Sequence, residues 1–332
     1  MKAVYIRSHG GPDVLEIREI PDPRGPQNTE VLVRVRAAGL NRPDLIQRRG
    51  LYPAPAGFPQ EIPGLEFAGE VEETGPDVSE FKPGDRVFGI TGGGAQAELL
   101  LTDQSLLARI PDDLSFTEAA AIPETFITAH DAIFTQAQLQ PGETLLIHSI
   151  GSGVGLAALQ LAKANGVRVF GTSRTPRKLD AARDLGLDEA ILAGEDADFA
   201  RIVLEKTGGK GVDVILDLVG AGYFARNLAS VALKGRLMLV GMMSGTKTEF
   251  DLGIALGKRL KIIGTLLRPR SVEEKAKATR AFIDEVVPLF ESGEIKPNID
   301  KIFGFTDVRA AHEYLESNAS FGKVVLQLRS DS

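Results

Sequence analysis

The first third of the chain alternates apolar and polar residues, which predicts β-strands with one buried face. Gly, Pro and Asp residues separate these segments, and this spacing is typical of a curled sheet or partial barrel. A short helix is expected at 43–49, ending at Gly50. The expected strands lie within 1–6, 14–20, 30–40, 65–74, 85–90, 95–101 and 106–111.

The pattern changes at Ser115, which with Glu118 matches a helix capping box. Helical sequence follows to about residue 137, with an interruption at Pro123. From residue 143, continuous apolar runs alternate with helical stretches. Strands of this kind are buried on both faces, so a parallel sheet covered by helices is expected. These strands lie within 144–149, 168–173, 189–192, 212–219, 236–242 and 261–267.

The end of the chain returns to strand-like sequence. A long helix is expected at about 271–292, and strands at 299–305 and 322–328 flank a helix at 307–317. We expect this tail to rejoin the first sheet. Because 332 residues exceed the roughly 250–300 at which one core stops growing, two domains are expected.

Composition narrows the classes of function. The net charge of −7 and the lack of a basic run argue against a nucleic-acid partner. The chain has no cysteine, which excludes disulfides, thiolate nucleophiles and cysteine-ligated zinc, and agrees with a cytoplasmic location. No membrane segment is expected, because the uncharged stretch 144–162 contains glycines and polar residues that fit a strand, a turn and a helix. No signal peptide is expected, because the first residues, MKAVYIRSHGG, lack an apolar core of the needed length.

The glycine-rich turn inside that stretch predicts a phosphate-binding site. Gly151, Gly153 and Gly155 lie between a buried strand and a helix, as in the first unit of a dinucleotide-binding fold. Glycine lets a pyrophosphate approach the backbone, and the N–H groups of the helix start hold it. The third glycine comes one residue early for a strict GxGxxG pattern, so a tight turn without a ligand is the alternative.

The end of the second strand of this series favours NADPH over NADH. An NAD site carries Asp or Glu there, whereas residues 169–178 contain no acid. Arg174, Arg177 and Lys178 follow instead, and they suit a 2′-phosphate. The alternative is that these cations only solvate a helix start, although the helix dipole disfavours them there.

Six segments in a fixed order give the chain a family resemblance. It resembles the medium-chain dehydrogenase/reductase superfamily, in its zinc-free, zeta-crystallin-like quinone oxidoreductase branch, and looks closest to the tumour-suppressor-inducible type. The resemblance covers essentially the whole chain. It rests on residues 37–53, 63–75, 81–89, 119–129, 145–163 and 321–328.

The resemblance implies an α/β protein with two domains. Residues 1–125 with 297–332 would form a GroES-like β-barrel catalytic domain, and 126–296 a Rossmann domain with a doubly wound parallel sheet. It also implies homodimers or homotetramers that pair through a Rossmann edge strand near 261–267. Zinc-dependent members carry a histidine ligand where this chain has Leu65, so no metal site is expected.

Without a metal, a thiol or a flavin site, direct hydride transfer from the nicotinamide to an electron-poor acceptor such as a quinone remains. By resemblance, Asn41 and Thr128 would lie at the nicotinamide and its ribose. Asn318 and Lys323 would close over the cofactor, with a polar turn before an edge strand as the alternative. Further cofactor contacts are implied for Ser152, Gly153, Val154, Gly171, Ser173, Arg174, Lys178, Gly241, Met242, Leu266 and Leu267.

Several relatives also stack a tyrosine near the adenine, after the third strand. Residues 190–195 hold no aromatic here, and Arg174 is a candidate to compensate.

The substrate pocket is expected around Asn41, Ile46 and Tyr52. Asn41 and Tyr52 are the candidate catalytic residues, and the Tyr52 phenol could donate a hydrogen bond to a quinone oxygen. The alternative for Tyr52 is a loop anchor. Asp44 equally suits a helix start, and we assign it no acid role.

Two other functions compete with an NADPH-dependent quinone reductase. One is an enone, alkenal or enoyl-thioester reductase on the same scaffold. The other is non-enzymatic, because zeta-crystallin-like proteins also serve as lens proteins or bind RNA. The acidic pI of about 5.3 argues against RNA.

Overall fold

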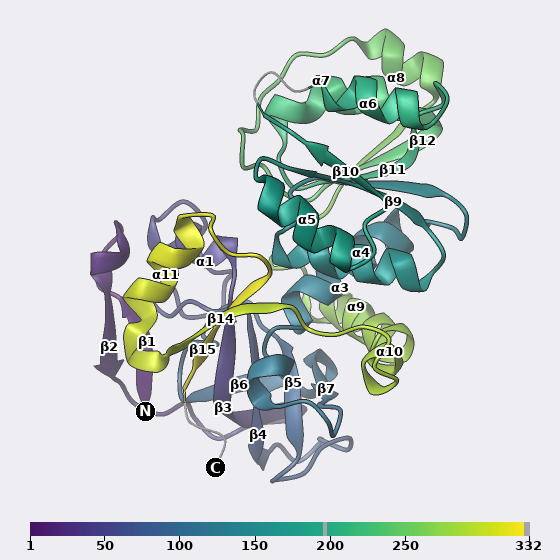
Figure 1. Cartoon of the computed structure of the whole chain (residues 1–332). Helices are drawn as coiled ribbons and strands as arrows, with labels where there is room; N and C mark the ends of the chain where they lie inside the picture. The colour runs from purple at the N-terminus through teal and green to yellow at the C-terminus, as the bar shows by residue number, and fades with distance from the viewer. Residues whose placement is uncertain (195–197, 329–332) are drawn as a thin grey trace. The chain divides into compact units, whose positions relative to one another are not determined.

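The computed structural model describes residues 1–194 and 198–328. The chain forms two compact units (Figure 1). Unit 1 comprises Met1–Ile127 with Leu267–Ser332, and unit 2 comprises Thr128–Leu266. Within the described residues, no helix combines the length and apolarity that crossing a membrane requires.

Unit 1 is built on a sheet in the order β14-β15-β3-β4-β5-β7, with β6 also paired to β3 and a separate β1-β2 hairpin. Its strands are β1 (Lys2–Ile6), β2 (Leu15–Glu19), β3 (Glu30–Leu40), β4 (Glu66–Thr74), β5 (Arg86–Ile90), β6 (Leu99–Asp103), β7 (Leu107–Arg109), β14 (Ile299–Gly304) and β15 (Lys323–Gln327). The alternating residues Val31, Val33 and Val35 of β3 point into the core, as the period-2 pattern predicts. Strand β15 pairs antiparallel with β3, which confirms that the C-terminal tail rejoins the first sheet.

The helices of unit 1 follow the predicted positions with two differences. They are α1 (Arg42–Arg48), α2 (Phe116–Ala119), α9 (Val272–Glu285), α10 (Val287–Glu291) and α11 (Val308–Glu316), and α3 (Pro123–His130) crosses the boundary between the units. The capping box of Ser115 and Glu118 is confirmed. The long helix expected at 271–292 is divided at Val286, because Pro288 begins a new first turn. The helical sequence after Pro123 ends in a π-helix at Asp131–Gln136.

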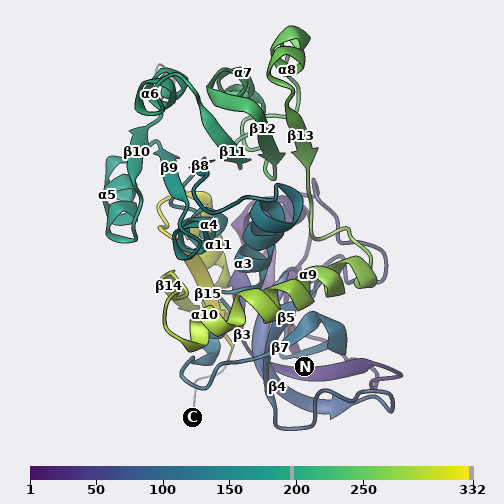
Figure 2. The same ribbon diagram turned by 90° about the vertical axis from the view of Figure 1, so that its right-hand side faces the viewer.

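Helices α9 and α10 belong to unit 1, whereas the sequence-based division placed 267–296 with the nucleotide-binding domain. Aromatic contacts explain their position. Phe282 of α9 meets Phe88 edge to face at 5.9 Å, and Phe290 of α10 meets Phe126 at 4.8 Å. Figure 2 shows α9 crossing over the strands of unit 1, and α9 also contacts β7.

Unit 2 is the predicted doubly wound parallel sheet. Its strands are β8 (Thr144–Ile147), β9 (Arg168–Ser173), β10 (Glu189–Leu192), β11 (Val212–Asp217), β12 (Val231–Leu239) and β13 (Lys261–Gly264). They are all parallel, in the order β10-β9-β8-β11-β12-β13. The chain winds outward in both directions from β8, which creates the crevice where this fold binds ligands.

Helices cover both faces of this sheet. They are α4 (Gly153–Ala164), α5 (Pro176–Asp184), α6 (Phe199–Lys206), α7 (Ala221–Ser230) and α8 (Leu252–Lys258). Figure 1 shows α4 and α5 on one face and α6, α7 and α8 on the other. The central strands β8, β9 and β11 are therefore buried on both faces, as their apolar runs predict: Leu146, Phe170 and Ile215 are fully buried. The edge strand β13 is largely exposed.

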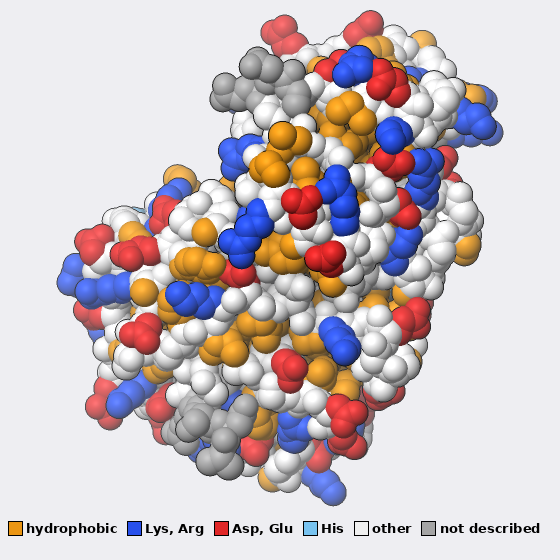
Figure 3. Space-filling view, viewed as in Figure 1, with side chains coloured by type: hydrophobic (Ala, Val, Ile, Leu, Met, Phe, Trp, Pro, Cys, Tyr) orange, Lys and Arg blue, Asp and Glu red, His pale blue; other side chains and the backbone are white. Residues whose placement is uncertain are grey.

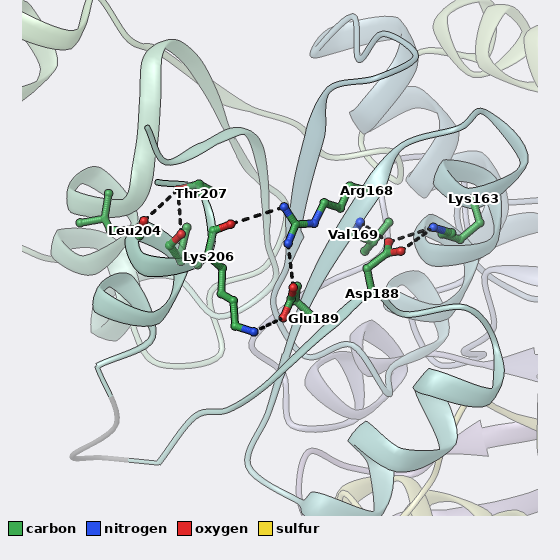
Figure 4. A network of polar contacts seen from close by, with 9 residues as sticks. Lys163, Arg168, Val169, Asp188, Glu189, Leu204, Lys206 and Thr207 are labelled. Atoms are coloured by element: carbon green, nitrogen blue, oxygen red, sulfur yellow. Dashed lines mark hydrogen bonds and ion pairs between the residues drawn. The ribbon is translucent and has the colours of Figure 1, made fainter. Parts of the chain in front are cut away.

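Ion pairs tie the amino ends of β9 and β10 to their helices (Figure 4). Lys163 of α4 pairs with Asp188 at 2.8 Å, and Arg168 of β9 pairs with Glu189 of β10 at 2.7 Å. Lys206 of α6 reaches the other oxygen of Glu189 at 3.3 Å. These pairs are partly exposed, so each contributes only about 0–1 kcal/mol to stability. Elsewhere on the face in Figure 3, acidic and basic side chains are intermixed.

Candidate functional site

The glycine turn of unit 2 has the geometry of a phosphate-binding helix start. Ser152 is the N-cap of α4, and its hydroxyl accepts a hydrogen bond from the Gly155 N–H at 3.1 Å. The other first-turn N–H groups of a helix lack partners within the helix. A Cβ at Gly155 would lie 2.7 Å from the carbonyl oxygens of Ser149 and Ile150. The early third glycine therefore has a packing role, since it lets α4 start directly against the turn.

The carboxyl end of β9 lies beside this turn. The Ile150 N–H donates to the Thr172 carbonyl, and a Cβ at Gly171 would meet the side chain of Ile150 at 2.9 Å. Ser173 is buried, and its hydroxyl accepts from the Thr175 N–H. Arg174 is exposed and Lys178 is half-buried. The structure thus brings the predicted residues of the two turns together, and their contacts with a cofactor stay predictions.

An aromatic side chain that the sequence analysis missed stands near Arg174. The positive charge of Arg174 favours ionisation of the Tyr223 phenol on α7, although burial raises the pKa of Tyr223 more strongly. The ring of Tyr223 is held against His148 and Phe199 at 4.9 and 5.0 Å. Residues 190–194 contain no aromatic side chain, as predicted, and Glu195 lies outside the described residues. Tyr223 was missed because it follows the fourth strand rather than the third.

A buried polar chain links the carboxyl ends of β8, β9 and β11. His148 is fully buried and contacts the Thr172 hydroxyl at 2.9 Å and the Asn227 amide oxygen at 2.7 Å. The Asn227 amide nitrogen donates to Asp217, whose other oxygen accepts the N–H groups of Val219 and Gly220. His148 is therefore a core histidine with both ring nitrogens in hydrogen bonds, and its Nε2–H donates to Asn227.

Burial lowers the pKa of His148 to about 4, so we expect acid to destabilise the protein. Between pH 6.5 and about 4 the unfolded histidine binds a proton that the folded one does not. Stability therefore falls as pH falls, by roughly 3 kcal/mol for this group. Between pH 7 and pH 4.5, the free energy of unfolding of His148→Gln should fall by less than that of wild type, as measured by chemical unfolding. The exposed His9→Gln is the control, and an equal loss in both variants contradicts the prediction.

The remaining predicted residues of unit 2 lie at its other strand ends. Gly241 follows β12, and its N–H donates to the Asp217 carbonyl at 3.1 Å. Met242 is exposed, as is Leu266 after β13, and Thr128 is half-buried in α3. Leu267 is buried and begins the second segment of unit 1.

Unit 1 holds a buried ion pair built around Asn41. The Lys323 ammonium donates to Glu66 at 2.5 Å, to the Asn41 side-chain oxygen at 2.7 Å and to the Leu40 carbonyl at 2.8 Å. The Asn41 amide nitrogen donates to the same Glu66 oxygen at 2.7 Å, and the Glu124 N–H donates to the other at 2.8 Å. The structure brings Asn41 and Lys323 into direct contact. All three ammonium protons have protein acceptors, so a contact of Lys323 with the cofactor stays a prediction.

Asp44 is a buried cap of α1. Its two oxygens accept the N–H groups of Asn41 and Gly64, at 2.8 and 3.0 Å. Burial raises the pKa of Asp44 to about 6 despite these bonds. The helix-start role considered for this residue is thus confirmed. Nearby, Arg42 donates to the side chain of Asn318 at 2.6 Å.

Tyr52 follows α1 and is half-buried, with its ring under the Arg268 guanidinium at 5.0 Å. Arg268 is 4% exposed and donates to the Gln47 side chain and to the carbonyls of Gly92 and Tyr52. Ile46 is half-buried on α1. The loop is therefore anchored by its backbone and its ring, and the phenol group is left for other contacts.

Three charged residues of this region were missed by the sequence analysis. Glu124 lies in the first turn of α3, and Arg268 and Lys275 lie after the Rossmann strands in sequence. Lys275 had a usable signal: it shares the buried face of α9 with Ala278 and Phe282, at spacings of three and seven. A lysine on an apolar helix face indicates a special environment.

The donor set does not fit a zinc ion. Leu65, at the position of the histidine ligand, is a fully buried apolar residue. Across residues 1–194 and 198–328, no group of three His, Cys, Asp or Glu side chains could hold a metal.

Comparisons with known proteins cover the whole chain. The alcohol dehydrogenase GroES-like domain family matches residues 27–112, and the zinc-binding dehydrogenase family matches 153–285. A quinone oxidoreductase of Pseudomonas aeruginosa is 39% identical over 98% of this chain and 99% of its own. The solved quinone oxidoreductase of Pseudomonas syringae pv. tomato is 34% identical, with a TM-score of 0.88 over 98% of this chain and 99% of its own.

Other solved structures of the same fold differ in cofactor or reaction. A mycobacterial protein in complex with NADPH is 32% identical, with a TM-score of 0.87 over 99% of this chain and 100% of its own. An NAD-dependent alcohol dehydrogenase is 33% identical, with a TM-score of 0.87 over 99% and 100%. The enoyl reductase CurK is 28% identical, with a TM-score of 0.86 over 98% of each chain.

Proposed function

Because the chain belongs to the medium-chain dehydrogenase/reductase superfamily and is quinone-oxidoreductase-like, we propose that it is an NADPH-dependent quinone reductase that uses neither metal nor flavin. Family membership already makes it an oxidoreductase that binds a nicotinamide cofactor. The observation that carries the finer proposal is Leu65 in place of a zinc ligand. The adjacent carboxylate of Glu66 is occupied by Lys323 and that of Asp44 by backbone N–H groups. An acceptor that needs no metal to polarise it, such as a quinone, suits this site.

In this proposal, the residues of the protein bind the cofactor and orient the substrate. A bound nicotinamide supplies the hydride. Ser152 and Gly155 shape the start of α4 so that its free N–H groups can hold a pyrophosphate. Arg268 fixes the Tyr52 ring by stacking, which limits the positions of the phenol beside a substrate oxygen.

The preference for NADPH is proposed from Ser173, Arg174 and Lys178. We expect Arg174→Glu to lower kcat/KM for NADPH by about 10–100-fold, because a charged hydrogen bond to the 2′-phosphate contributes roughly 1.5–3 kcal/mol. The value for NADH should change less than threefold. Steady-state kinetics with both cofactors measure this, and Arg183→Ala, exposed in the last turn of α5, is the control. Equal losses with both cofactors would contradict the prediction.

The first test of the proposed function is NADPH oxidation by the metal-stripped protein with phenanthrenequinone. NADH and an alkenal are tested in parallel. Turnover with the quinone, faster with NADPH, supports the proposal. Turnover with the alkenal alone makes the protein a double-bond reductase, the alternative favoured by its similarity to an enoyl reductase structure. If NADPH binds but neither acceptor is reduced, the proposed acceptor is wrong. If NADPH does not bind, the proposed nucleotide site is wrong.

We also propose a homodimer or larger homo-oligomer that forms through β13. This strand is an edge of the six-stranded sheet, so its outer backbone groups can pair with a second copy. Exposed apolar side chains flank it: Leu252, Leu256, Ile262 and Leu266. The cytoplasmic location predicted from the sequence remains a proposal.

A further inference from the structure

Three polar side chains in unit 1 make no hydrogen bond with the described residues. Lys275 is only 2% exposed, yet its ammonium makes no hydrogen bond or ion pair with the described residues. The carboxyl of Glu124 and the phenol of Tyr52 are half-buried and likewise make no hydrogen bond to the described chain. For Lys275 this is unusual, because burying a charged group without a hydrogen-bond partner costs several kcal/mol in general and native proteins rarely do it without a use.

Shared contacts place these groups in one region. The Phe58 ring, which faces the Lys275 ammonium, lies against Gly92. The Gly92 carbonyl accepts a hydrogen bond from Arg268, and Arg268 stacks on the Tyr52 ring. The negative charge of Glu124 raises the pKa of both Lys275 and Tyr52. The positive charge of Arg268 lowers the pKa of all three groups. Glu124, Lys275 and Tyr52 thus form one cluster, here called the polar triad. Its members come from α3, α9 and the loop after α1.

Surrounding residues hold the polar triad in place. The Lys275 ammonium lies 5.3 Å from the centre of the Phe58 ring, a cation–π contact that leaves its three N–H donors available. The Glu124 backbone is fixed by its N–H bond to Glu66. Arg268 fixes Tyr52 through the ring and the carbonyl, while its donors are used by protein acceptors. Arg268 is therefore a positioning residue.

From this geometry we infer that the polar triad is the subsite for the oxygen of the acceptor, with Glu124 as proton donor and Lys275 and Tyr52 as hydrogen-bond donors to the same oxygen. The inference rests on the proposed function for the source of the hydride. The hydride brings two electrons and one hydrogen to the acceptor, and its oxygen becomes negative. The O–H bond of Glu124 then breaks, and a new O–H bond forms on the reduced acceptor. Solvent returns one proton to Glu124, so NADPH, H⁺ and quinone yield NADP⁺ and hydroquinone.

The protonation state of Glu124 agrees with this role. Burial and the charge of Glu66 raise the pKa of Glu124 to about 8, so the group carries its proton at pH 7. The other charged groups that face it are Asp44 on α1, Lys323 on β15, and Arg268 and Lys275. Rate should therefore decline as pH rises through about 8.

Glu124→Gln tests the proton donor, because the amide keeps the shape of the neutral acid but cannot transfer a proton. We expect kcat with phenanthrenequinone to fall by about 100-fold, in the usual range for general-acid catalysis. The decline near pH 8 should disappear from the residual rate. The NADPH dissociation constant, from fluorescence titration, should change less than twofold.

Lys275→Met and Tyr52→Phe test the hydrogen-bond donors. The control is Lys277→Met, on the exposed face of the same helix. The probe is 2-naphthol, an unreactive aromatic hydroxyl compound, titrated against the protein loaded with NADP⁺. We expect Lys275→Met to weaken 2-naphthol binding at least tenfold and Tyr52→Phe about threefold, with no change for Lys277→Met.

The two measurements separate the subsite from the proposed function. If wild type reduces no quinone but binds 2-naphthol in a way that depends on Lys275, the subsite stands and the quinone reductase assignment fails. If Glu124→Gln and Lys275→Met retain their fold by circular dichroism and match wild type in turnover, pH profile and 2-naphthol affinity, the inference is overturned. Tyr52→Phe keeps the ring under Arg268, so its 2-naphthol affinity still tests the subsite if another variant unfolds.

Discussion

Lys323→Met is expected to lower the free energy of unfolding by about 3–5 kcal/mol. The substitution keeps the length of the side chain but leaves the Glu66 carboxylate, which is fully buried, without its cation. Removing one partner of a buried ion pair costs more than the pair itself contributes, because the other charge stays desolvated. The Asn41 oxygen and the Leu40 carbonyl also lose a donor. Chemical denaturation followed by circular dichroism measures the loss.

Two further variants test this reason for the loss. Lys82→Met removes an exposed lysine of the same unit and should change stability by less than about 0.5 kcal/mol. Adding Glu66→Gln to Lys323→Met removes the unpaired charge, and the amide oxygen can still accept the Glu124 N–H. The double variant should therefore be more stable than Lys323→Met alone. A single-variant loss below about 1 kcal/mol would show that the carboxylate finds other partners.

Gly155→Ala is expected to weaken NADPH binding by about 30–100-fold, or roughly 2–3 kcal/mol. The new Cβ would lie 2.7 Å from two backbone carbonyl oxygens, and backbone cannot give way as a flexible side chain does. The start of α4 must therefore move away from the turn, and the N–H groups proposed to hold the pyrophosphate move with it. Fluorescence titration of NADPH measures the affinity.

The matched control is Gly257→Ala in α8, where a Cβ meets no atom of the described chain within 4 Å. Its NADPH affinity should equal that of wild type, and its stability should rise slightly because alanine favours a helix. An affinity of Gly155→Ala within threefold of wild type would mean that the cofactor does not depend on this turn.

The buried ion pair and the proposed catalytic side chains of unit 1 differ in their hydrogen bonding. Lys323, Glu66 and Asn41 use their hydrogen bonds on one another. The side chains of Glu124 and Lys275 make no such bonds within the described chain, although Glu124 is joined to Glu66 through its backbone. The Glu66 carboxylate of this pair contributes to the raised pKa of Glu124, while the Lys323 ammonium opposes it.

The sequence by itself determined most of the secondary structure and the glycine-rich turn between β8 and α4. Alternation in β3 and apolar runs such as β8 depend on which faces of a strand are buried, and that information is local. The capping box of Ser115 and the glycines of the turn act on backbone a few residues away, so they could also be predicted from the sequence. Asn41 and Lys323 were named only by resemblance to a family.

Tertiary structure decided which charged residues meet. Glu66, Glu124 and Lys323 come from β4, α3 and β15, and no periodicity links positions so far apart in the chain. Packing of Phe282 against Phe88 placed α9, and with it Lys275, on unit 1. The ionisation of a buried group depends on burial and on neighbouring charge in space. Those quantities exist only once the distant segments have folded together.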